Sequence, residues 1–357
     1  MIEITKCPGT LADGFSSYSN SFLRNVFNGK KVSHILPYDS PVSNSESNLL
    51  FKNSRKYISI SGFQEKFSVL LEKNVLRLIQ EGEQGQYILK PIPTFGKKPH
   101  QMPANEHLTM QIARQVFGIE TADNELIFFK NGEPAYLTKR FDVAKDGTKR
   151  AQEDFASLAG KTPQTHGEHY KYDGNYLEIF HLLKKFVPAY PIEAPKLLKL
   201  ILFNYLFSNS DAHFKNFSII ETKMGDFKLS PAYDLINSSI HIDDSVFALE
   251  DGLLPKSMGQ GKIAHQFGKL SEEARIYKQI FDQLFELMVS KSDQVEYFIQ
   301  ASYLDESTKR HYLQTYQGRL NRLIKWVKLN HIKSLTGGKT NEYKCLKHYF
   351  LAVNKYN

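Results

Sequence analysis

The pattern of hydrophobic and polar positions changes along the chain, and its first part predicts β-strands. Short apolar runs there are separated by turn residues, as at Asn131-Gly132, which is typical of antiparallel hairpins. The strands predicted in this way are residues 66–72, 75–79, 86–90, 125–130 and 134–140. One helix is predicted among them, over residues 105–117, because apolar residues recur on one face and Gly118 provides a C-terminal cap.

After about residue 143 the apolar residues recur with helical spacing. The helices predicted there are residues 175–186, 195–208, 272–290, 292–302 and 307–329. Two short strands, 217–220 and 227–230, flank a turn at Met224-Gly225. Residues 1–55 are rich in Ser, Asn, Gly and Pro, with a loop predicted over 37–48.

These elements predict an α+β fold with two lobes. The first lobe would contain a loop-rich segment, residues 1–57, followed by residues 58–142 with the strands and one main helix. The second, mostly helical lobe would contain residues 143–357.

Composition fits a soluble globular protein. The chain has 357 residues, of which 41% are hydrophobic and 24% charged. It has no run of about 18 apolar residues, and its first residues lack the apolar core of a signal peptide. Cys7 and Cys345 are far apart and predict no disulfide framework. A cytoplasmic protein without a membrane partner is therefore expected.

The positive charge is concentrated at the C-terminus. Residues 319–357 contain nine Lys or Arg and one Glu, which accounts for the whole net charge of +8. One interpretation is an amphipathic packing helix with a solvated basic face, in which Trp326 lies among aliphatic residues at helical spacing. The other is a surface that contacts nucleic acid or an acidic partner.

Three polar residues have the spacing needed for phosphoryl transfer from ATP. Asp211 and Asn216 are five positions apart, and Asp234 follows eighteen residues later, across a predicted strand. In such a set one carboxylate takes the proton of the attacking hydroxyl, while the amide oxygen and the second carboxylate hold Mg²⁺. Protein kinases place a base and a metal-binding Asn at the same offset. Asp and Asn also form ordinary turns, so the spacing alone leaves that alternative open.

Other parts of a nucleotide site can be placed in the first part of the chain. Residues 59–66 lie in a loop position where backbone N–H groups can hold phosphate oxygens, although a plain hairpin turn is equally compatible. Lys90 ends a predicted strand in the position of a phosphate-binding lysine. Glu106 can pair with it, or can simply favour a helix N-terminus. Residues 139–141 are placed to form a hinge that meets an adenine edge.

Seven blocks of sequence together resemble the HipA family, the serine/threonine kinase toxins of bacterial HipA/HipB-type toxin–antitoxin systems. The blocks, in family order, are Ile60-Ser61-Gly62-Phe63-Gln64-Glu65-Lys66, Tyr87-Ile88-Leu89-Lys90, Asn105-Glu106, Lys139-Arg140-Phe141-Asp142, Gln152-Glu153-Asp154-Phe155, Asp211-Ala212-His213-Phe214-Lys215-Asn216-Phe217-Ser218 and Pro231-Ala232-Tyr233-Asp234. The resemblance implies a protein-kinase-like fold and ATP and Mg²⁺ as cofactors.

The resemblance also implies a role for each matching residue. Asp211 would be the catalytic base, Asn216 and Asp234 the Mg²⁺ ligands, and Ser59 or Ser61 the site of an inactivating autophosphorylation. The implied ATP-binding residues are Ser61, Gly62, Phe63, Gln64, Glu65, Lys66, Lys90, Lys139, Arg140, Phe141, His213, Lys215 and Tyr233.

Partners are likewise implied by the resemblance. Family members phosphorylate glutamyl- or tryptophanyl-tRNA synthetase, which arrests translation. The short segment before Ser59 and the opening Cys7-Pro8-Gly9-Thr10-Leu11 look like HipT, the kinase of three-component HipB/HipS/HipT systems. We therefore expect a HipS-like small protein, docked on an open face of the first lobe, and a HipB-like helix-turn-helix antitoxin. DNA contact would be indirect or through the basic C-terminal segment.

Four alternative interpretations assign the sequence to another class of protein or site. A glycoside hydrolase could pair Asp211 with Asp234, but it gives Asn216 and Lys90 no role. A zinc site could be built from His166, Glu168, His169 and His181, most of which lie in a predicted loop. A DNA-binding regulator needs a reading element that the sequence does not contain. A small-molecule kinase shares the same base, Asn and Asp, and the spacing does not exclude it.

Overall fold

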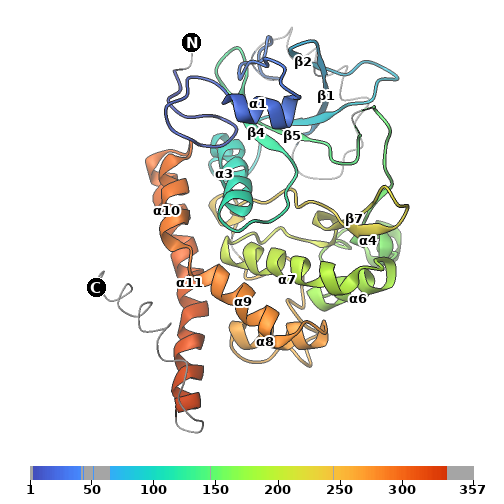
Figure 1. Ribbon diagram of the computed structural model, residues 1–357, viewed down its shortest axis with the longest axis vertical. Coiled ribbons are helices and arrows are strands. Elements are labelled where there is room, and N and C mark those ends of the chain that lie inside the picture. The colour runs from blue at the N-terminus through green and yellow to red at the C-terminus, as the bar shows by residue number, and fades with distance from the viewer. Residues whose placement is uncertain are drawn as a thin grey trace.

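The computed structural model describes residues 3–41, 43, 51, 65–144, 146–243 and 245–335, with side chains described as far as Ile324. A five-stranded antiparallel sheet lies at one end of the molecule and most of the helices at the other (Figure 1). The sheet has the order β2-β1-β3-β5-β4. Its strands are β1 (Phe67–Glu72), β2 (Val75–Leu78), β3 (Tyr87–Lys90), β4 (Asn124–Phe128) and β5 (Pro134–Lys139). All five predicted strands of this region are confirmed.

The two faces of this sheet are covered by different parts of the chain. Along β4, alternate side chains point to opposite faces: Ile127 belongs to one hydrophobic cluster and Leu126 to another. The first cluster includes the buried residues of α1 (Asn20–Phe27). The second includes α3 (Met102–Gln115), which corresponds to the helix predicted between the strands.

Helix α1 is an element that the prediction for residues 1–55 did not include. Ser19 caps the helix by accepting a hydrogen bond from the Phe22 backbone N–H at 3.2 Å, and Asn28 ends it with φ 54°. Phe22 and Val26, four residues apart, are buried against the sheet. Among the described residues, one face of the sheet is therefore covered by this segment.

The first segment is also attached to the end of the helical part. Tyr303 Oη donates to the Lys6 carbonyl at 2.5 Å, and Tyr297 Oη donates to Asp13 Oδ2 at 3.2 Å. Tyr297 lies in α10 (Ser292–Ala301) and Tyr303 follows it. Residues separated by most of the chain thus lie side by side.

The helical part contains a small second sheet and most of the longer helices. The sheet has the order β6-β7-β8, with β6 (Gln152–Asp154), β7 (Ser218–Glu221) and β8 (Phe227–Leu229). The other helices are α4 (Phe155–Leu158), α5 (Pro163–His166), α6 (Tyr176–Phe186), α7 (Tyr190–Leu206), α8 (Ile263–Glu273), α9 (Lys278–Val289) and α11 (Glu306–Leu335), with 3₁₀ turns at Pro99–Gln101, Phe214–Asn216 and Ser238–Ile240.

Two predicted helices differ from the structure. Helix α7 begins five residues before the predicted start. Pro191 is tolerated in its first turn, and Pro195, the predicted start, lies inside the helix. The helix predicted over 272–290 is confirmed only as α9, which begins at Lys278, because α8 and α9 are separated at Arg275, whose φ is 57°. Strand β6 was not predicted; its three residues pair with Ser218, Ile219 and Ile220.

Helices α10 and α11 follow one another along one side of the molecule (Figure 1). On α11, the buried Tyr316 stacks on Phe207, with ring centroids 5.1 Å apart, and the Arg319 guanidinium lies 5.1 Å from the Tyr205 ring centroid. The predicted packing face of this helix is thus present as far as its side chains are described. Trp326 and most of the basic C-terminal segment lie outside the described side chains. None of the described helices is both long and apolar enough to cross a bilayer.

Candidate functional site

The loop that carries Asp211 connects α7 to β7 and is fixed by hydrogen bonds from several elements. The Ser210 backbone N–H donates to Ser238 Oγ at 2.8 Å. Tyr176 Oη, on α6, donates to the Ala212 carbonyl at 2.8 Å. The Phe214 backbone N–H donates to the Lys171 carbonyl at 3.1 Å. A loop held from three directions can present a side chain in a fixed place.

Asp211 lies at the surface of this loop with 46% of its side chain exposed. Tyr172 Oη donates to Asp211 Oδ1 at 2.7 Å. Burial of the rest of the group raises the pKa of Asp211, while the Tyr172 hydrogen bond and the Lys171 charge act in the opposite direction. The carboxylate is therefore both oriented and accessible.

A cluster of four charged side chains joins the sheet to the helical part. Lys90 Nζ, at the end of β3, lies 2.6 Å from Glu106 Oε1 on α3 and 2.5 Å from Asp234 Oδ1. Lys66 Nζ lies 3.2 Å from Asp234 Oδ2. The predicted pairing of Lys90 with Glu106 is confirmed. Asp234, which has a left-handed φ of 55°, is brought to the same lysine from another part of the chain.

Attraction between opposite charges in this cluster favours the ionised forms of Asp234 and Lys90. Burial alone would raise the pKa of Asp234, but the charges of Lys66 and Lys90 hold it well below its usual range. Burial would lower the pKa of Lys90, but Asp234 and Glu106 outweigh it and the pKa lies above its usual value. Lys90 is 4% exposed, so water screens the attraction between its ammonium group and the two carboxylates only weakly.

Asn216 and its neighbours form a compact turn beside Asp211. Asn216 Oδ1 accepts a hydrogen bond from the His213 backbone N–H at 3.1 Å. His213 is buried; burial and the nearby Lys171 charge lower its pKa to about 3, so the ring is neutral at pH 7. Its Nδ1 has no hydrogen-bond partner among the described residues. Lys215 Nζ lies 3.7 Å from Asp154 Oδ2, at the N-terminus of α4.

Of the predicted hinge residues 139–141, only Phe141 has its side chain beside the other site residues. Phe141 packs against Tyr233, with ring centroids 5.7 Å apart, and Tyr233 Oη donates to the Lys215 carbonyl at 2.9 Å. In contrast, Lys139 Nζ donates to the Val26 carbonyl at 2.8 Å, and the Arg140 guanidinium pairs with Asp142 at 2.6 Å. The side chains of Lys139 and Arg140 thus make structural contacts.

The predicted phosphate loop is described only at its end. Ser59, Ser61, Gly62, Phe63 and Gln64 lie outside the described residues. Glu65 and Lys66 are described, and the Lys66 ammonium group reaches Asp234.

The oxygen atoms of Asn216 and Asp234 fit a hard cation such as Mg²⁺, which prefers carboxylate and amide oxygens. Both Asp234 oxygens accept from lysine ammonium groups, so a bound cation would share this carboxylate with Lys66 and Lys90. In the described part of the chain no cluster of three or more His, Cys, Asp or Glu could hold a metal ion. The zinc alternative therefore gains no support.

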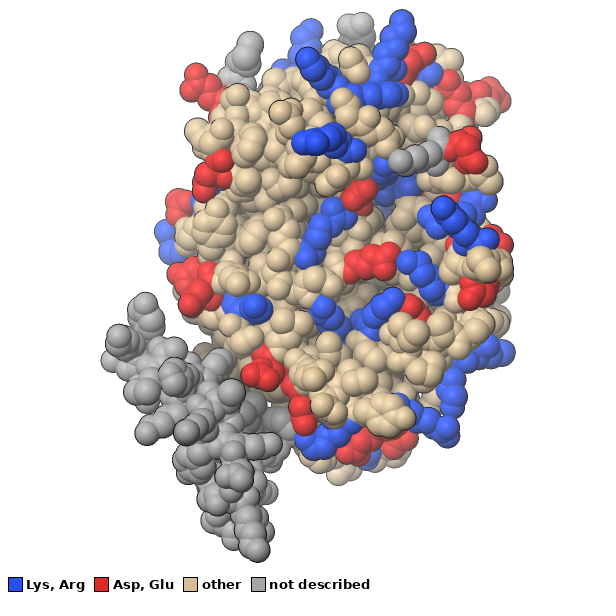
Figure 2. Space-filling model, viewed as in Figure 1, with Lys and Arg blue, Asp and Glu red and all other residues tan. Residues whose placement is uncertain are grey.

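Charges of both signs alternate over the face of the molecule that Figure 2 shows, instead of forming a single basic patch. A protein that binds nucleic acid through its surface normally gathers Lys and Arg on one face. The described residues on this face do not favour the DNA-binding alternative.

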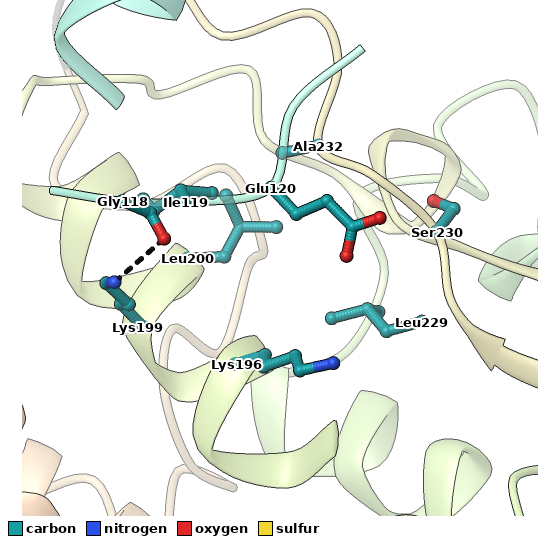
Figure 3. Close-up of a pocket in the computed structure, with 9 residues that line it drawn as sticks. All are labelled: Gly118, Ile119, Glu120, Lys196, Lys199, Leu200, Leu229, Ser230 and Ala232. Atoms are coloured by element: carbon teal, nitrogen blue, oxygen red, sulfur yellow. Dashed lines mark hydrogen bonds between the residues drawn. The ribbon is translucent and has the colours of Figure 1, made fainter. Parts of the chain in front are cut away.

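A cavity of about 140 Å³ lies apart from these residues, between the turn after α3, helix α7 and the chain that follows β8 (Figure 3). Its lining residues are Gly118, Ile119, Glu120, Lys196, Lys199, Leu200, Leu229, Ser230 and Ala232. Lys199 Nζ donates to the Gly118 carbonyl at 3.1 Å. The cavity contains none of the predicted site residues.

Two residues beside Asp211 were missed by the sequence analysis. Tyr172 and Lys171, 39 and 40 positions before Asp211, lie in the stretch that had been considered only for a zinc site. Tyr172 donates a hydrogen bond to Asp211, and Lys171 acts on it through its charge. No short-range pattern marks them, because their place depends on how α5 and α6 position the connection between them.

The chain is similar to known proteins in sequence and in fold. A model of the family described as the HipA-like C-terminal domain matches residues 58–295. A protein of Haemophilus influenzae that carries a provisional name as a kinase is 25% identical over 331 residues, covering 86% of this chain and 93% of its own length. Y4mE of Sinorhizobium fredii, also named provisionally as a kinase, is 31% identical over 52% of this chain and 44% of its own.

Among solved structures, HipA of Shewanella oneidensis MR-1, determined in a complex with HipB and operator DNA, has a similar fold. The TM-score is 0.57 at 22% identity, and the match covers 74% of this chain and 65% of that HipA chain. The mixed arrangement of a β-sheet with a helical part is therefore shared with HipA.

Proposed function

Because the chain belongs to the HipA-like C-terminal domain family, we propose that it is an ATP- and Mg²⁺-dependent serine/threonine protein kinase, with the two-lobed arrangement of such kinases. The observation that carries this proposal is that the Lys90 ammonium group lies within hydrogen-bond distance of both the Glu106 and the Asp234 carboxylates. Lys90 and Asp234 are 144 positions apart in the sequence. A lysine held by a helix glutamate is the device by which protein kinases bind the phosphates of ATP.

Each residue has a defined task in the proposed reaction. Asp211 accepts the proton of the attacking serine or threonine hydroxyl; the new O–P bond forms to the γ-phosphorus as the bond to the bridging oxygen breaks, and ADP leaves. Lys90 and Lys66 hold the phosphates. Asn216 and Asp234 would hold Mg²⁺, which supplies charge neutralisation on the phosphates when bound.

The remaining implied ATP-binding residues complete the proposed nucleotide site. Phe141 and Tyr233 offer an aromatic contact for the base, and the backbone of residues 139–141 offers hydrogen-bonding groups for its edge. His213 and Lys215 would lie beside the phosphates, and residues 61–66 would cover them.

In biological terms, we propose a toxin of a bacterial toxin–antitoxin system, most like HipT, that acts in the cytoplasm on an aminoacyl-tRNA synthetase, tryptophanyl or glutamyl. The support is the family match and the sequence resemblance. A HipB-like antitoxin and a HipS-like small protein are the proposed partners, and the HipB complex of the similar HipA fold supports the first. Since α1 and its loops cover the sheet, HipS would dock elsewhere. Failure of this chain to co-purify with either co-expressed partner would remove this part of the proposal.

Phosphate transfer to the chain itself provides the direct test. Purified protein incubated with Mg²⁺ and γ-labelled ATP is expected to label itself on Ser59 or Ser61, located by mass spectrometry. A phosphate there adds about 1.5 to 2 negative charges beside the ATP phosphates, so the modified enzyme should bind ATP weakly. Ser59→Ala/Ser61→Ala protein should remain unlabelled but active on its substrate, because the loop would hold the phosphates through backbone N–H groups, which both substitutions keep.

A small-molecule kinase of the same fold gives a different result in this test. It would consume ATP only with its small substrate and label no protein. Absence of Mg²⁺-dependent phosphate transfer to any protein would contradict the protein-kinase form, and absence of ATP consumption with added small-molecule acceptors as well would contradict the other.

A further inference from the structure

Tyr172 is held tightly against the loop that carries Asp211. Its backbone N–H donates to the His169 carbonyl at 2.8 Å, and its carbonyl accepts from the Glu250 N–H at 3.0 Å. Its ring packs edge-on against His213, with centroids 5.1 Å apart, and Lys171 Nζ lies 4.9 Å from the ring centroid. A tyrosine fixed at both backbone and ring keeps its hydroxyl in one place.

That hydroxyl makes a short hydrogen bond to one oxygen of the proposed base. Tyr172 Oη lies 2.7 Å from Asp211 Oδ1. Among the described residues, Asp211 Oδ2 accepts no hydrogen bond, and the side chain is half exposed. One oxygen is therefore fixed while the other remains available to a hydroxyl from solution.

We propose that Tyr172 is a positioning residue for Asp211, whose carboxylate it orients so that Oδ2 receives the proton of the substrate hydroxyl. This inference rests on the proposed kinase function. A general base must lie within hydrogen-bond reach of the proton that it removes, and a carboxylate free to rotate on a surface loop meets this condition only part of the time.

The hydrogen bond also favours the ionised form of Asp211, which is the form that can accept a proton. The other groups that act on this carboxylate are Lys171, Lys66 and Asp234, together with the neutral His213 ring at 4.0 Å from Oδ1. Burial and the Asp211 charge raise the pKa of Tyr172 above its usual value. The phenol therefore remains a donor throughout the range in which Asp211 is charged.

The test compares Tyr172→Phe with Tyr176→Phe. Both lose one hydroxyl, but Tyr176 donates to the Ala212 carbonyl, so its variant loosens the same loop without touching the carboxylate. For Tyr172→Phe we expect kcat to fall about three- to tenfold with an unchanged KM for ATP. We also expect the acid limb of the kcat/KM profile to move up by roughly one pH unit. Tyr176→Phe should lose stability and leave that limb in place.

Two outcomes would overturn the inference. One is an unchanged kcat and acid limb in Tyr172→Phe; the other is an equal shift of the limb in Tyr176→Phe, which would mean a purely structural role. A wild-type protein without phosphotransfer activity would instead contradict the proposed function. In that case a ¹³C NMR titration of the Asp211 carboxyl, assigned with Asp211→Asn, still tests the contact. Equal titration midpoints in wild type and Tyr172→Phe would show that the hydroxyl does not act on the carboxylate.

Discussion

The Asp211→Asn variant is expected to lose phosphotransfer by a factor of about 10² to 10⁴ while unfolding at the same temperature as the wild type. The amide cannot accept the proton of the attacking hydroxyl, so the chemical step loses its base. Stability should be kept because the side chain is half exposed and the amide oxygen can still accept from Tyr172. The measurements are initial rates of phosphate transfer and thermal melts of both proteins.

Asp282→Asn is the matched control for this variant. Asp282 lies on α9 with 52% of its side chain exposed and pairs only with Lys278 among the interactions described. The same chemical change there should leave the rate unaltered. Wild-type rates in Asp211→Asn would exclude Asp211 as the base.

Lys90→Met should have the largest combined effect, on both activity and stability. The substitution leaves the Glu106 carboxylate, 4% exposed, without its ion-pair partner, and breaking a buried pair in this way costs about 3–5 kcal/mol. The phosphates of ATP also lose a cation that Asp234 and Glu106 keep charged. We expect a lower denaturation midpoint and loss of ATP binding, measured by chemical unfolding and calorimetric titration.

A second substitution separates these two effects. In Lys90→Met/Glu106→Gln the buried carboxylate is neutralised, so most of the lost stability should return, while ATP binding should not. If ATP binding returned together with stability, Lys90 would have only a structural role. If Lys90→Met alone were as stable as the wild type, the buried cluster would contribute little to the fold.

The elements that were predicted correctly are those with a strong local pattern. The hairpin of β4 and β5 was predicted because turn residues separate two apolar runs, and α3 because its apolar face ends at Gly118. Helix α1 was missed because it has only eight residues and half of them are polar. The break at Arg275 was missed because neither Gly nor Pro marks it. There the local conformation follows tertiary packing, which a short window of sequence does not contain.

The candidate site divides in the same way. Lys90 and Glu106 could be paired from sequence, since a strand end and the start of the next helix are neighbours in many folds. The approach of Lys66 to the other oxygen of Asp234, and of Tyr172 to Asp211, could not be predicted, because each joins segments from separate elements. The catalytic, ATP-binding and metal-binding roles of these residues, and the lobe boundaries at 57 and 142, stay predictions.

The attachment of the first segment to the end of α10 has a consequence for synthesis on the ribosome. Asp13 and Tyr297 are 284 positions apart, and at about 5–20 residues per second the second is added roughly 15 to 60 s after the first. The segment can settle on the sheet once β4 and β5 have emerged, but its contacts with Tyr297 and Tyr303 must wait. A nascent chain stalled before Tyr297 therefore has an incompletely anchored first segment, and these contacts form only after Tyr303 has been added.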